Sequence, residues 1–294
     1  MKLSDIAELL LLAAVWGGSF LFMRIAAPVL GPIWLIEFRV LLAGLVLLPI
    51  LVHLNLIQEV RRRWLPLLVV GGVNSAVPFS LFAFASISLP AGFMAILNAT
   101  APLFGTVVAL IWLKEPLTPP RLMGFILGFV GVVILVGWNA IAATPAFFLA
   151  VAAGLFASLL YAIAAPYAKQ NLAGVPSLVV ATGSQLGAAC LLLPALPFTA
   201  PQQIPSAIVI VSVVALALLS TSFAYILYFR LIQNIGSTRA LTVAYLIPLF
   251  AMFWGAVVLQ EAITASMLWG CGLVLLGTAI ANDLFVKLLR GKKT

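Results

Sequence analysis

Polar and aromatic side chains recur at helical spacing within an otherwise apolar sequence. Trp16, Ser19 and Phe20 share one face of a predicted helix, and Asn98 stands four residues before Pro102. Polar groups on membrane helices turn away from lipid, where amides and phenols can bind a small molecule and aromatic rings can stack on it. Serines that only join helices, and aromatics that only pack, are the alternative. The predicted substrate-binding residues are Trp16, Ser19, Phe20, Asn74, Phe82, Asn98, Tyr161, Tyr225 and Tyr245.

Three ionisable residues, Arg24, Glu37 and Arg39, lie within the first two predicted helices, near the same end of each. An Arg–Glu pair could lock these two helices together. Alternatively, an arginine left without a partner could attract the carboxylate of a substrate. The sequence leaves both interpretations open.

Pro102 and Pro248 lie midway along two other predicted helices. A proline has no amide hydrogen, so the carbonyls of Asn98 and Ala244 lose their helical partners. Water or a substrate ammonium could bond to these carbonyls, or Ser and Thr hydroxyls could do so while the prolines only bend the helices. The pair Pro102 and Pro248 is predicted to act as a hinge.

The residues that enzymes use are scarce. The chain has one histidine, His53, and two cysteines, Cys190 and Cys271, and its predicted helices contain no paired carboxylates. A nucleophile with its base, or a metal cluster, therefore has little to be built from. The sequence predicts a protein that is not an enzyme and that needs no metal and no cofactor.

Composition indicates what holds these residues in place. With 65% hydrophobic and 7% charged residues, the 294-residue chain cannot present the polar surface of a soluble domain. Crossing a bilayer takes about twenty apolar residues, and ten such stretches follow one another with little sequence to spare. The predicted membrane helices span residues 5–26, 33–52, 65–87, 91–113, 120–138, 145–168, 174–197, 206–228, 237–259 and 264–285.

An internal repeat relates the two halves of the chain. Residues 95–134 match residues 241–280 without gaps, at positions whose numbers differ by 146. Leucine identities are uninformative in an apolar chain, but a mid-helix proline, a helix-end glutamate and two glycines in one register are specific. The matched residues are Pro102 with Pro248, Glu115 with Glu261, Gly124 with Gly270 and Gly131 with Gly277. The glutamates are expected to be structural or gate-stabilising rather than ligands.

The repeat predicts the topology. Five helices in each half is an odd number, so the halves must enter the membrane in opposite directions, which is the inverted-repeat architecture of secondary transporters. We therefore predict an all-α integral membrane protein with ten transmembrane helices arranged as two inverted five-helix repeats. The predicted repeats cover residues 1–140 and residues 141–294.

Charge asymmetry predicts the orientation. The net charge is +8, and the loops 27–32, 88–90, 139–144 and 198–205 contain no Lys or Arg. Because basic loops stay in the cytoplasm, both termini are expected there, with the C-terminal Lys and Arg residues among the cytoplasmic charges. The basic balance is thus a topology signal, and no nucleic-acid partner is expected.

Several motifs lie along both halves of the chain: Trp16-Gly17-Gly18-Ser19-Phe20, Arg24, Phe38-Arg39, Asn98-Ala99-Thr100-Ala101-Pro102-Leu103-Phe104 with Glu115 and Gly124, Tyr228-Phe229-Arg230, Gly236-Ser237-Thr238-Arg239-Ala240 and Tyr245-Leu246-Ile247-Pro248. Together they resemble the EamA family of the drug/metabolite transporter superfamily. The resemblance implies a ten-helix carrier of the bacterial inner membrane that exports small metabolites. YddG-like exporters of aromatic amino acids belong to this group.

These observations predict export by alternating access, with apolar or aromatic amino acids as the expected substrates. Other amphipathic metabolites or drugs are the alternative, and an enzyme or a scaffold is the competing class. Apart from Glu8 near its start, the first helix lacks the membrane glutamate that suits cationic drugs, and no cluster of Lys and Arg suits phosphates. The expected partners are the lipid bilayer and a small-molecule substrate, and the chain is expected to function as a monomer. Movement down the substrate gradient is favoured over proton coupling.

Overall fold

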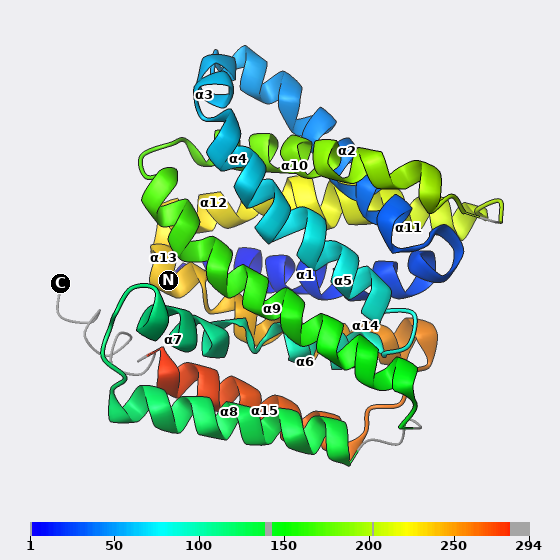
Figure 1. Ribbon diagram of the computed structural model, residues 1–294, viewed down its shortest axis with the longest axis vertical. Coiled ribbons are helices and arrows are strands. Elements are labelled where there is room, and N and C mark those ends of the chain that lie inside the picture. The colour runs from blue at the N-terminus through cyan, green and yellow to red at the C-terminus, as the bar shows by residue number, and fades with distance from the viewer. Residues whose placement is uncertain (1, 139–142, 202, 283–294) are drawn as a thin grey trace.

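The protein is a bundle of helices whose long members run from one end of the molecule to the other (Figure 1). The computed structural model describes residues 2–138, 143–201 and 203–282, and every regular element in these ranges is helical. The predicted all-α class is therefore confirmed. The predicted boundary between residues 140 and 141, and the basic C-terminal residues, lie outside the described residues.

The first half of the chain begins with two long helices separated by Gly31. Its elements are α1 (Leu3–Leu30), α2 (Pro32–His53), α3 (Ile57–Arg62), α4 (Trp64–Gly71), the π-helix η1 (Gly72–Ala76), α5 (Val77–Ala85), α6 (Ala91–Asn98), α7 (Ala101–Ile111) and α8 (Pro119–Gly137). Gly31 has a φ of 72°, which favours glycine, and Pro32 begins the next helix, so the chain reverses there.

The second half follows a similar course. Its elements are α9 (Pro145–Asn171), α10 (Ser177–Leu192), the 3-10 helix η2 (Leu193–Phe198), α11 (Ala207–Ala217), the π-helix η3 (Leu218–Phe223), α12 (Ala224–Ile235), α13 (Ser237–Ala240), α14 (Val243–Leu259) and α15 (Ala265–Ala281). In both halves a π-helix lies between two α-helices of one continuous segment, at η1 and at η3.

Seven segments within the described residues are long and apolar enough to cross a membrane. One of them, Leu3–His53, contains both α1 and α2, and two further apolar helices, α14 and α15, have 17 residues each. Many large apolar side chains on these helices are exposed, as expected of a surface that faces lipid.

Helices α8 and α15 lie side by side along one edge of the bundle (Figure 1). A Cβ on Gly124 would lie 2.5 Å from the carbonyl oxygen of Gly277, and one on Gly277 would lie 2.5 Å from that of Gly124. Gly131 and Gly270 approach each other in the same reciprocal way, at 2.9 Å. The two helices therefore run antiparallel, with backbones too close for any side chain at these four positions.

Matching turns precede α8 and α15. Lys114 and Gln260, whose numbers differ by 146, have φ angles of 53° and 56°, in the left-handed region. The next residues, Glu115 and Glu261, donate their backbone amides to the carbonyls of Ala109 and Gly255, at 3.1 and 3.0 Å. The two repeat segments thus end in the same backbone geometry.

Candidate functional site

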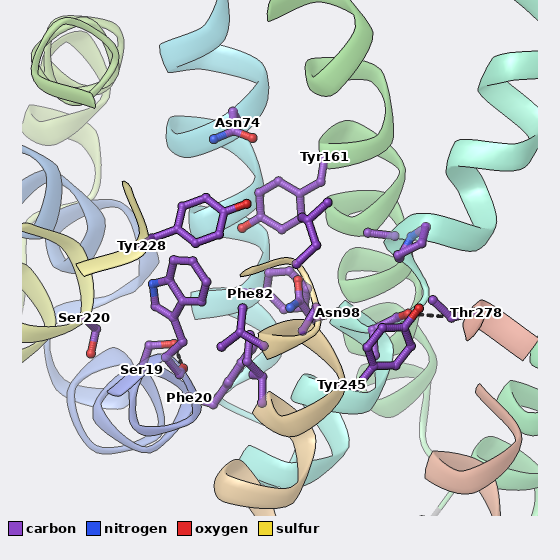
Figure 2. A pocket seen from close by; sticks show the side chains of 18 of the residues that line it. Ser19, Phe20, Asn74, Phe82, Asn98, Tyr161, Ser220, Tyr228, Tyr245 and Thr278 are labelled. Carbon is purple, nitrogen blue, oxygen red and sulfur yellow. Dashed lines mark hydrogen bonds between the residues drawn. The ribbon is translucent and has the colours of Figure 1, made fainter. Parts of the chain in front are cut away.

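A cavity of about 620 Å³ lies between the two halves of the bundle. Ten of the residues around it are labelled in Figure 2, including Asn98 and Tyr245 from the two repeat segments. All nine predicted substrate-binding residues line this cavity: Trp16, Ser19, Phe20, Asn74, Phe82, Asn98, Tyr161, Tyr225 and Tyr245. Residues chosen by helical spacing therefore come together in one shared compartment.

Aromatic rings form one wall of the cavity. The rings of Phe20 and Phe82 meet edge to face with centroids 5.7 Å apart, and Phe82 stacks on Tyr161 at 6.2 Å. Phe79, one turn before Phe82, meets Tyr161 edge to face at 6.4 Å. The hydroxyl groups of Tyr161 and Tyr228 point toward one another (Figure 2). The result is an apolar surface with phenol groups at its margin, which suits a flat apolar molecule that carries a polar group.

The two π-helices bring polar side chains to the cavity. In η1, Asn74 precedes Pro78 by four residues, and since Pro78 has no amide hydrogen, the backbone there widens to a bond from Val77 N to Gly72 O. In η3, Ser220 lines the cavity, and the hydroxyl of the next residue, Thr221, donates to the carbonyl of Leu216, five residues earlier, at 3.0 Å. Each π-helix thus lies midway along a membrane segment where an extra polar residue faces inward.

The two predicted hinge prolines lie in different settings. The chain breaks at Ala99 and Thr100 between α6 and α7, and Pro102 stands in the first turn of α7, at the cavity. Helix α14 continues without interruption through Pro248, which is buried outside the cavity lining. The expectation that both prolines lie midway along similar helices is therefore wrong for Pro102. Helix α6 ends at Asn98, so Pro102 stands at the start of a new helix rather than in the middle of one.

Hydroxyl groups bond to several carbonyls at the α6–α7 break. The carbonyl of Leu97 accepts hydrogen bonds from Thr100 Oγ1 at 2.6 Å and from Ser158 Oγ at 2.9 Å. The carbonyl of Ala99 accepts one from Thr278 Oγ1 at 3.2 Å. Neighbouring Ser and Thr residues thus stabilise the break, but through the carbonyls of Leu97 and Ala99 rather than the Asn98 carbonyl that the sequence analysis singled out.

The three ionisable residues of the first two helices have separate roles. The predicted Arg–Glu pair does not form: Arg24 instead bonds to Glu261, with Nε 3.3 Å from Oε1. Glu37 is 2% exposed, and neither of its carboxylate oxygens has a hydrogen-bond partner within the described residues. Arg39, two positions further on, lies on nearly the opposite side of α2, where it lines the cavity.

A polar cluster around Glu261 lies at one end of the bundle, outside the cavity lining. Besides its ion pair with Glu261, Arg24 donates from Nη1 to the carbonyls of Ser86 and Ile87, at 2.6 and 2.7 Å. The other carboxylate oxygen of Glu261 accepts a bond from the amide of Ala91, the first residue of α6, at 2.9 Å. These contacts join α1, the turn before α6 and the end of α14.

The opposite end of the bundle is open. A second cavity of about 470 Å³ shares Pro102, Tyr161 and Asn282 with the first and extends past α7 to Arg121 and Lys169. Both basic residues lie beside the turn that follows α7, and Glu261 contacts the first residue of α6. The basic residues and Glu261 are therefore at opposite ends of the α6–α7 segment. The two cavities together form a passage from the aromatic wall to this basic end.

Several lining residues were missed by the sequence analysis. Phe79 and Tyr228 lie one turn from the predicted Phe82 and Tyr225, so helical spacing could have found them. Thr278 and Asn282 come from α15, whose pattern showed only packing glycines. No local signal distinguishes such residues from helix-joining ones, because their position depends on how α15 meets α6.

Comparison with known proteins identifies the family. The sequence profile of the EamA-like transporter family matches residues 6–137 and 148–282. The chain belongs to the EamA-like transporter family. Its internal repeat corresponds to two successive matches of that profile, one in each half of the chain. The family resemblance predicted from the sequence motifs is confirmed at this level.

Similar proteins of the EamA-like type occur in distant organisms. An uncharacterized transporter of Archaeoglobus fulgidus is 23% identical over 275 residues, covering 92% of this chain and 96% of its own. The uncharacterized transporter YvbV of Bacillus subtilis is 25% identical over 284 residues, covering 92% and 89%. Protein PecM of Dickeya dadantii is 26% identical over 293 residues, covering 97% and 93%. This protein is therefore a multi-pass membrane transporter.

A solved crystal structure of a protein shares the fold of this EamA-like chain. The TM-score is 0.67 at 21% identity, and the match covers 98% of this chain and 99% of the other.

Proposed function

We propose that this EamA-like transporter exports small amphipathic metabolites, foremost amino acids with apolar or aromatic side chains, across the bacterial inner membrane. The observation that carries the proposal is the cavity itself: aromatic rings form its wall, it adjoins a second cavity lined by basic residues, and a polar cluster joins distant segments at the other end of the bundle. Basic residues stay on the cytoplasmic side, so the open end faces the cytoplasm, with both termini there.

The proposed topology has ten membrane crossings in two inverted five-helix repeats, residues 1–140 and 141–294, related by a pseudo-twofold axis. Three features support it. The four packing glycines contact each other reciprocally, the turns before α8 and α15 match, and each half has a π-helix in a corresponding segment. Glu115 follows the last residue of the Ala91–Ile111 segment, whereas Glu261, its counterpart in the second repeat, contacts the first residue of that segment. The two glutamates therefore lie at opposite ends of this segment, as expected if the two repeats point in opposite directions.

The proposed mechanism is alternating access. Substrate enters the cavity from the basic end, and release requires that the cluster around Glu261 opens while the basic end closes. The break between α6 and α7 at Pro102 is the proposed bending point, with Pro248 as its counterpart in α14. Changing both to alanine should abolish transport in a protein that still elutes as a folded species, and unchanged flux would reject the hinge.

The proposed driving force is the substrate gradient. Among the described residues that line the cavity, none is an Asp or a Glu that could exchange a proton with a substrate. Substrate-driven acidification or alkalinisation of vesicles, followed with an internal pH dye, would contradict this part of the proposal. The monomer is the proposed functional unit, since the cavity is built within one chain.

Counterflow in proteoliposomes tests the proposed function. Vesicles loaded with unlabelled phenylalanine should accumulate labelled phenylalanine and tryptophan. Tyr161→Ala removes the ring that stacks on Phe82, so the KM should rise about ten-fold. The matched control is Phe129→Ala, because Phe129 is 60% exposed on the outer side of α8. Accumulation of cationic drugs but of no amino acid would instead favour the alternative class of substrate.

A further inference from the structure

The charge of the cavity distinguishes between classes of substrate. Of the described residues that line it, Arg39 is the only charged one, and the rest are apolar, amide, hydroxyl or phenol groups. A zwitterion carries a positive and a negative group, and the cavity offers a charged partner only for the negative one. The site is therefore built around a cation, and its natural complement is an anion.

Arg39 is positioned by the protein without being neutralised. Its Nε donates to the hydroxyl of Thr221 in η3 at 3.0 Å, and that hydroxyl in turn donates to the carbonyl of Leu216. The guanidinium carbon lies 3.7 Å from the centroid of the Phe79 ring. Within the described residues, no carboxylate forms an ion pair with Arg39, and no hydrogen bond reaches its two terminal nitrogens.

The nearest acidic residue in the sequence cannot serve as a counterion. Glu37 lies two residues before Arg39 on α2, and residues two apart point to nearly opposite sides of a helix. An arginine that is 5% exposed and has no counterion among the described residues is costly in a membrane interior. Its planar pair of terminal donors fits a carboxylate in bidentate fashion, and such a ligand supplies the missing charge.

The same ring system connects this cation to the aromatic wall. Phe79 lies beneath the guanidinium of Arg39 and also meets Tyr161, which stacks on Phe82. A molecule with its carboxylate on Arg39 can therefore lay a flat ring against Tyr161 and Phe82. A single arginine matches a single carboxylate better than a multiply charged phosphate ester.

The passage to the cavity is lined by positively charged residues, as the cavity itself is at Arg39. Lys169 and Arg121 line the second cavity. Arg121 is paired with Glu115 at 2.7 Å, whereas Lys169 forms no ion pair within the described part of the chain. Positive charge along a narrow passage raises the local concentration of anions.

We propose that Arg39 recognises the carboxylate of the transported molecule, and that the substrates are aromatic monocarboxylates in which an ammonium group is tolerated but not required. This inference rests on the proposed function, which supplies the aromatic part of the substrate. It goes further because it makes the carboxylate, rather than the amino-acid backbone as a whole, the recognised group.

Three compounds with the same ring separate the possibilities: 3-phenylpropanoate carries only the carboxylate, L-phenylalanine carries both charges, and 2-phenylethylamine carries only the ammonium. Uptake of each labelled compound into proteoliposomes is measured at neutral pH, with the flux into protein-free liposomes subtracted. The expected KM values of 3-phenylpropanoate and phenylalanine lie within about three-fold of each other. That of 2-phenylethylamine is at least about ten-fold higher, because Arg39 repels its charge.

Substitution of the arginine tests its role directly. Arg39→Gln should raise the KM of both carboxylates about ten-fold or more, and should leave that of 2-phenylethylamine unchanged or lower. Arg39→Lys keeps the charge but loses the planar pair of donors, so its KM for the carboxylates should lie between those of the wild type and Arg39→Gln. Thr221→Val keeps the arginine but removes its Nε partner, and a KM increase of about three-fold is expected. The matched control, Arg61→Gln, changes an exposed arginine on α3 that lines neither cavity.

Two results would overturn the proposal. One is transport of 2-phenylethylamine by the wild-type protein with a KM equal to that of the carboxylates. The other is an Arg39→Gln protein, monodisperse in detergent, that changes all three KM values equally or none of them. If phenylalanine is transported in either case, only this inference fails. If no compound of the three is transported while an unrelated cation is, the proposed function fails with it.

Discussion

Residues 102–115 and 248–261 begin with the same proline and end with the same glutamate after the same left-handed turn. Their glutamates nevertheless have different partners. Within the part of the chain that the structure describes, Glu115 pairs only with Arg121, six residues along the chain, and its side chain is 43% exposed. Glu261 is 15% exposed and joins its own helix end to Arg24 and to the amide of Ala91.

A single sequence difference helps to explain this contrast. The carboxylate of Glu261 lies directly over Gly255, where a Cβ would overlap its Oε2 atom. The matching residue in the first half is Ala109, which has a Cβ. Both residues accept the amide of their glutamate, so the backbone is alike and only the space beside it differs. The repeat therefore supplies the same turn twice, and one methyl group decides whether the glutamate can fold back over its helix.

The difference between the two ends has a consequence for function. An exporter needs one end of its cavity open while the other is closed. Here Glu261 joins distant segments, whereas the ion pair of Glu115 is local; the distant ion pair near that end, Arg230 with Glu8 at 3.0 Å, does not involve the matched turn. The following variants test this contrast, from the largest expected effect to the smallest.

Glu261→Gln should have the largest effect. It removes the charge that pairs with Arg24 and weakens the bond to the Ala91 amide, and hydrogen bonds to charged groups contribute roughly 1.5–3 kcal/mol. We expect a loss of about 2–3 kcal/mol in the free energy of unfolding, together with new solvent access at this end. Glu115→Gln, measured beside it by unfolding in detergent, should cost less than about 0.5 kcal/mol, as surface ion pairs do. Equal losses would contradict the contrast.

Gly124→Ala should cost about 2 kcal/mol, because the new methyl group would lie 2.5 Å from the carbonyl oxygen of Gly277 and would push α8 away from α15. Its repeat counterpart, Gly270→Ala, meets the Gly131 carbonyl at 2.9 Å and should cost slightly less. Gly272→Ala is the control, since nothing lies within 4 Å of that position. Thermal unfolding of the three variants in the same detergent gives the ranking. A Gly272→Ala loss as large as the others would argue against close packing as the cause.

Gly255→Ala makes the second repeat segment resemble the first. The added methyl group displaces the Glu261 carboxylate, so stability should fall by about 1–2 kcal/mol and access at this end should increase, as for Glu261→Gln. In the double variant the two losses should not add, because both remove the same interaction. Fully additive losses would show that the methyl group acts elsewhere. The reverse change, Ala109→Gly, should alter access little.

Thr264→Ala should have the smallest effect, about 1 kcal/mol, because it removes the N-cap hydrogen bond from Met267 N to Thr264 Oγ1 at the start of α15. The matching Thr118 begins α8 but accepts no such bond from the backbone. Thr118→Ala should therefore cost only a few tenths of a kcal/mol. Differential scanning calorimetry in detergent compares the unfolding midpoints of the two variants. Identical midpoints would contradict the N-cap role of Thr264.

Much of the fold was accessible from the sequence, because apolar length, turn residues and a repeat act locally or in register. Every predicted helix overlaps a helical segment, and the polar residues chosen by helical spacing line one cavity. The partners of the charged residues were not accessible. Arg24 and Glu261 are 237 residues apart, and their contact depends on how α1 packs against α14. The sequence left open an Arg–Glu pair between the first two helices, whereas Arg24 pairs with Glu261.

The break at Pro102 shows the same limit at shorter range. Both repeat segments contain the proline, but only the first has a helix break two residues before it, and Thr278 from α15 bonds to a carbonyl exposed there. The matching prolines predicted two similar helices. The helix break before Pro102 instead depends on neighbours that are distant in the sequence. The contrast between Gly255 and Ala109 was visible in the repeat, but its meaning required the position of the glutamate side chain.

The central claim is that the two matched turns lie at opposite faces of the membrane, on either side of one cavity. Pro116 and Ala262 are exposed residues at equivalent positions of these turns, so each can be replaced by cysteine in a chain whose Cys190 and Cys271 have been changed to alanine. An impermeant maleimide added to right-side-out and inside-out vesicles should label the cysteine at position 116 only from the cytoplasmic side and the one at position 262 only from the outside. Labelling of both from the same side would contradict the account.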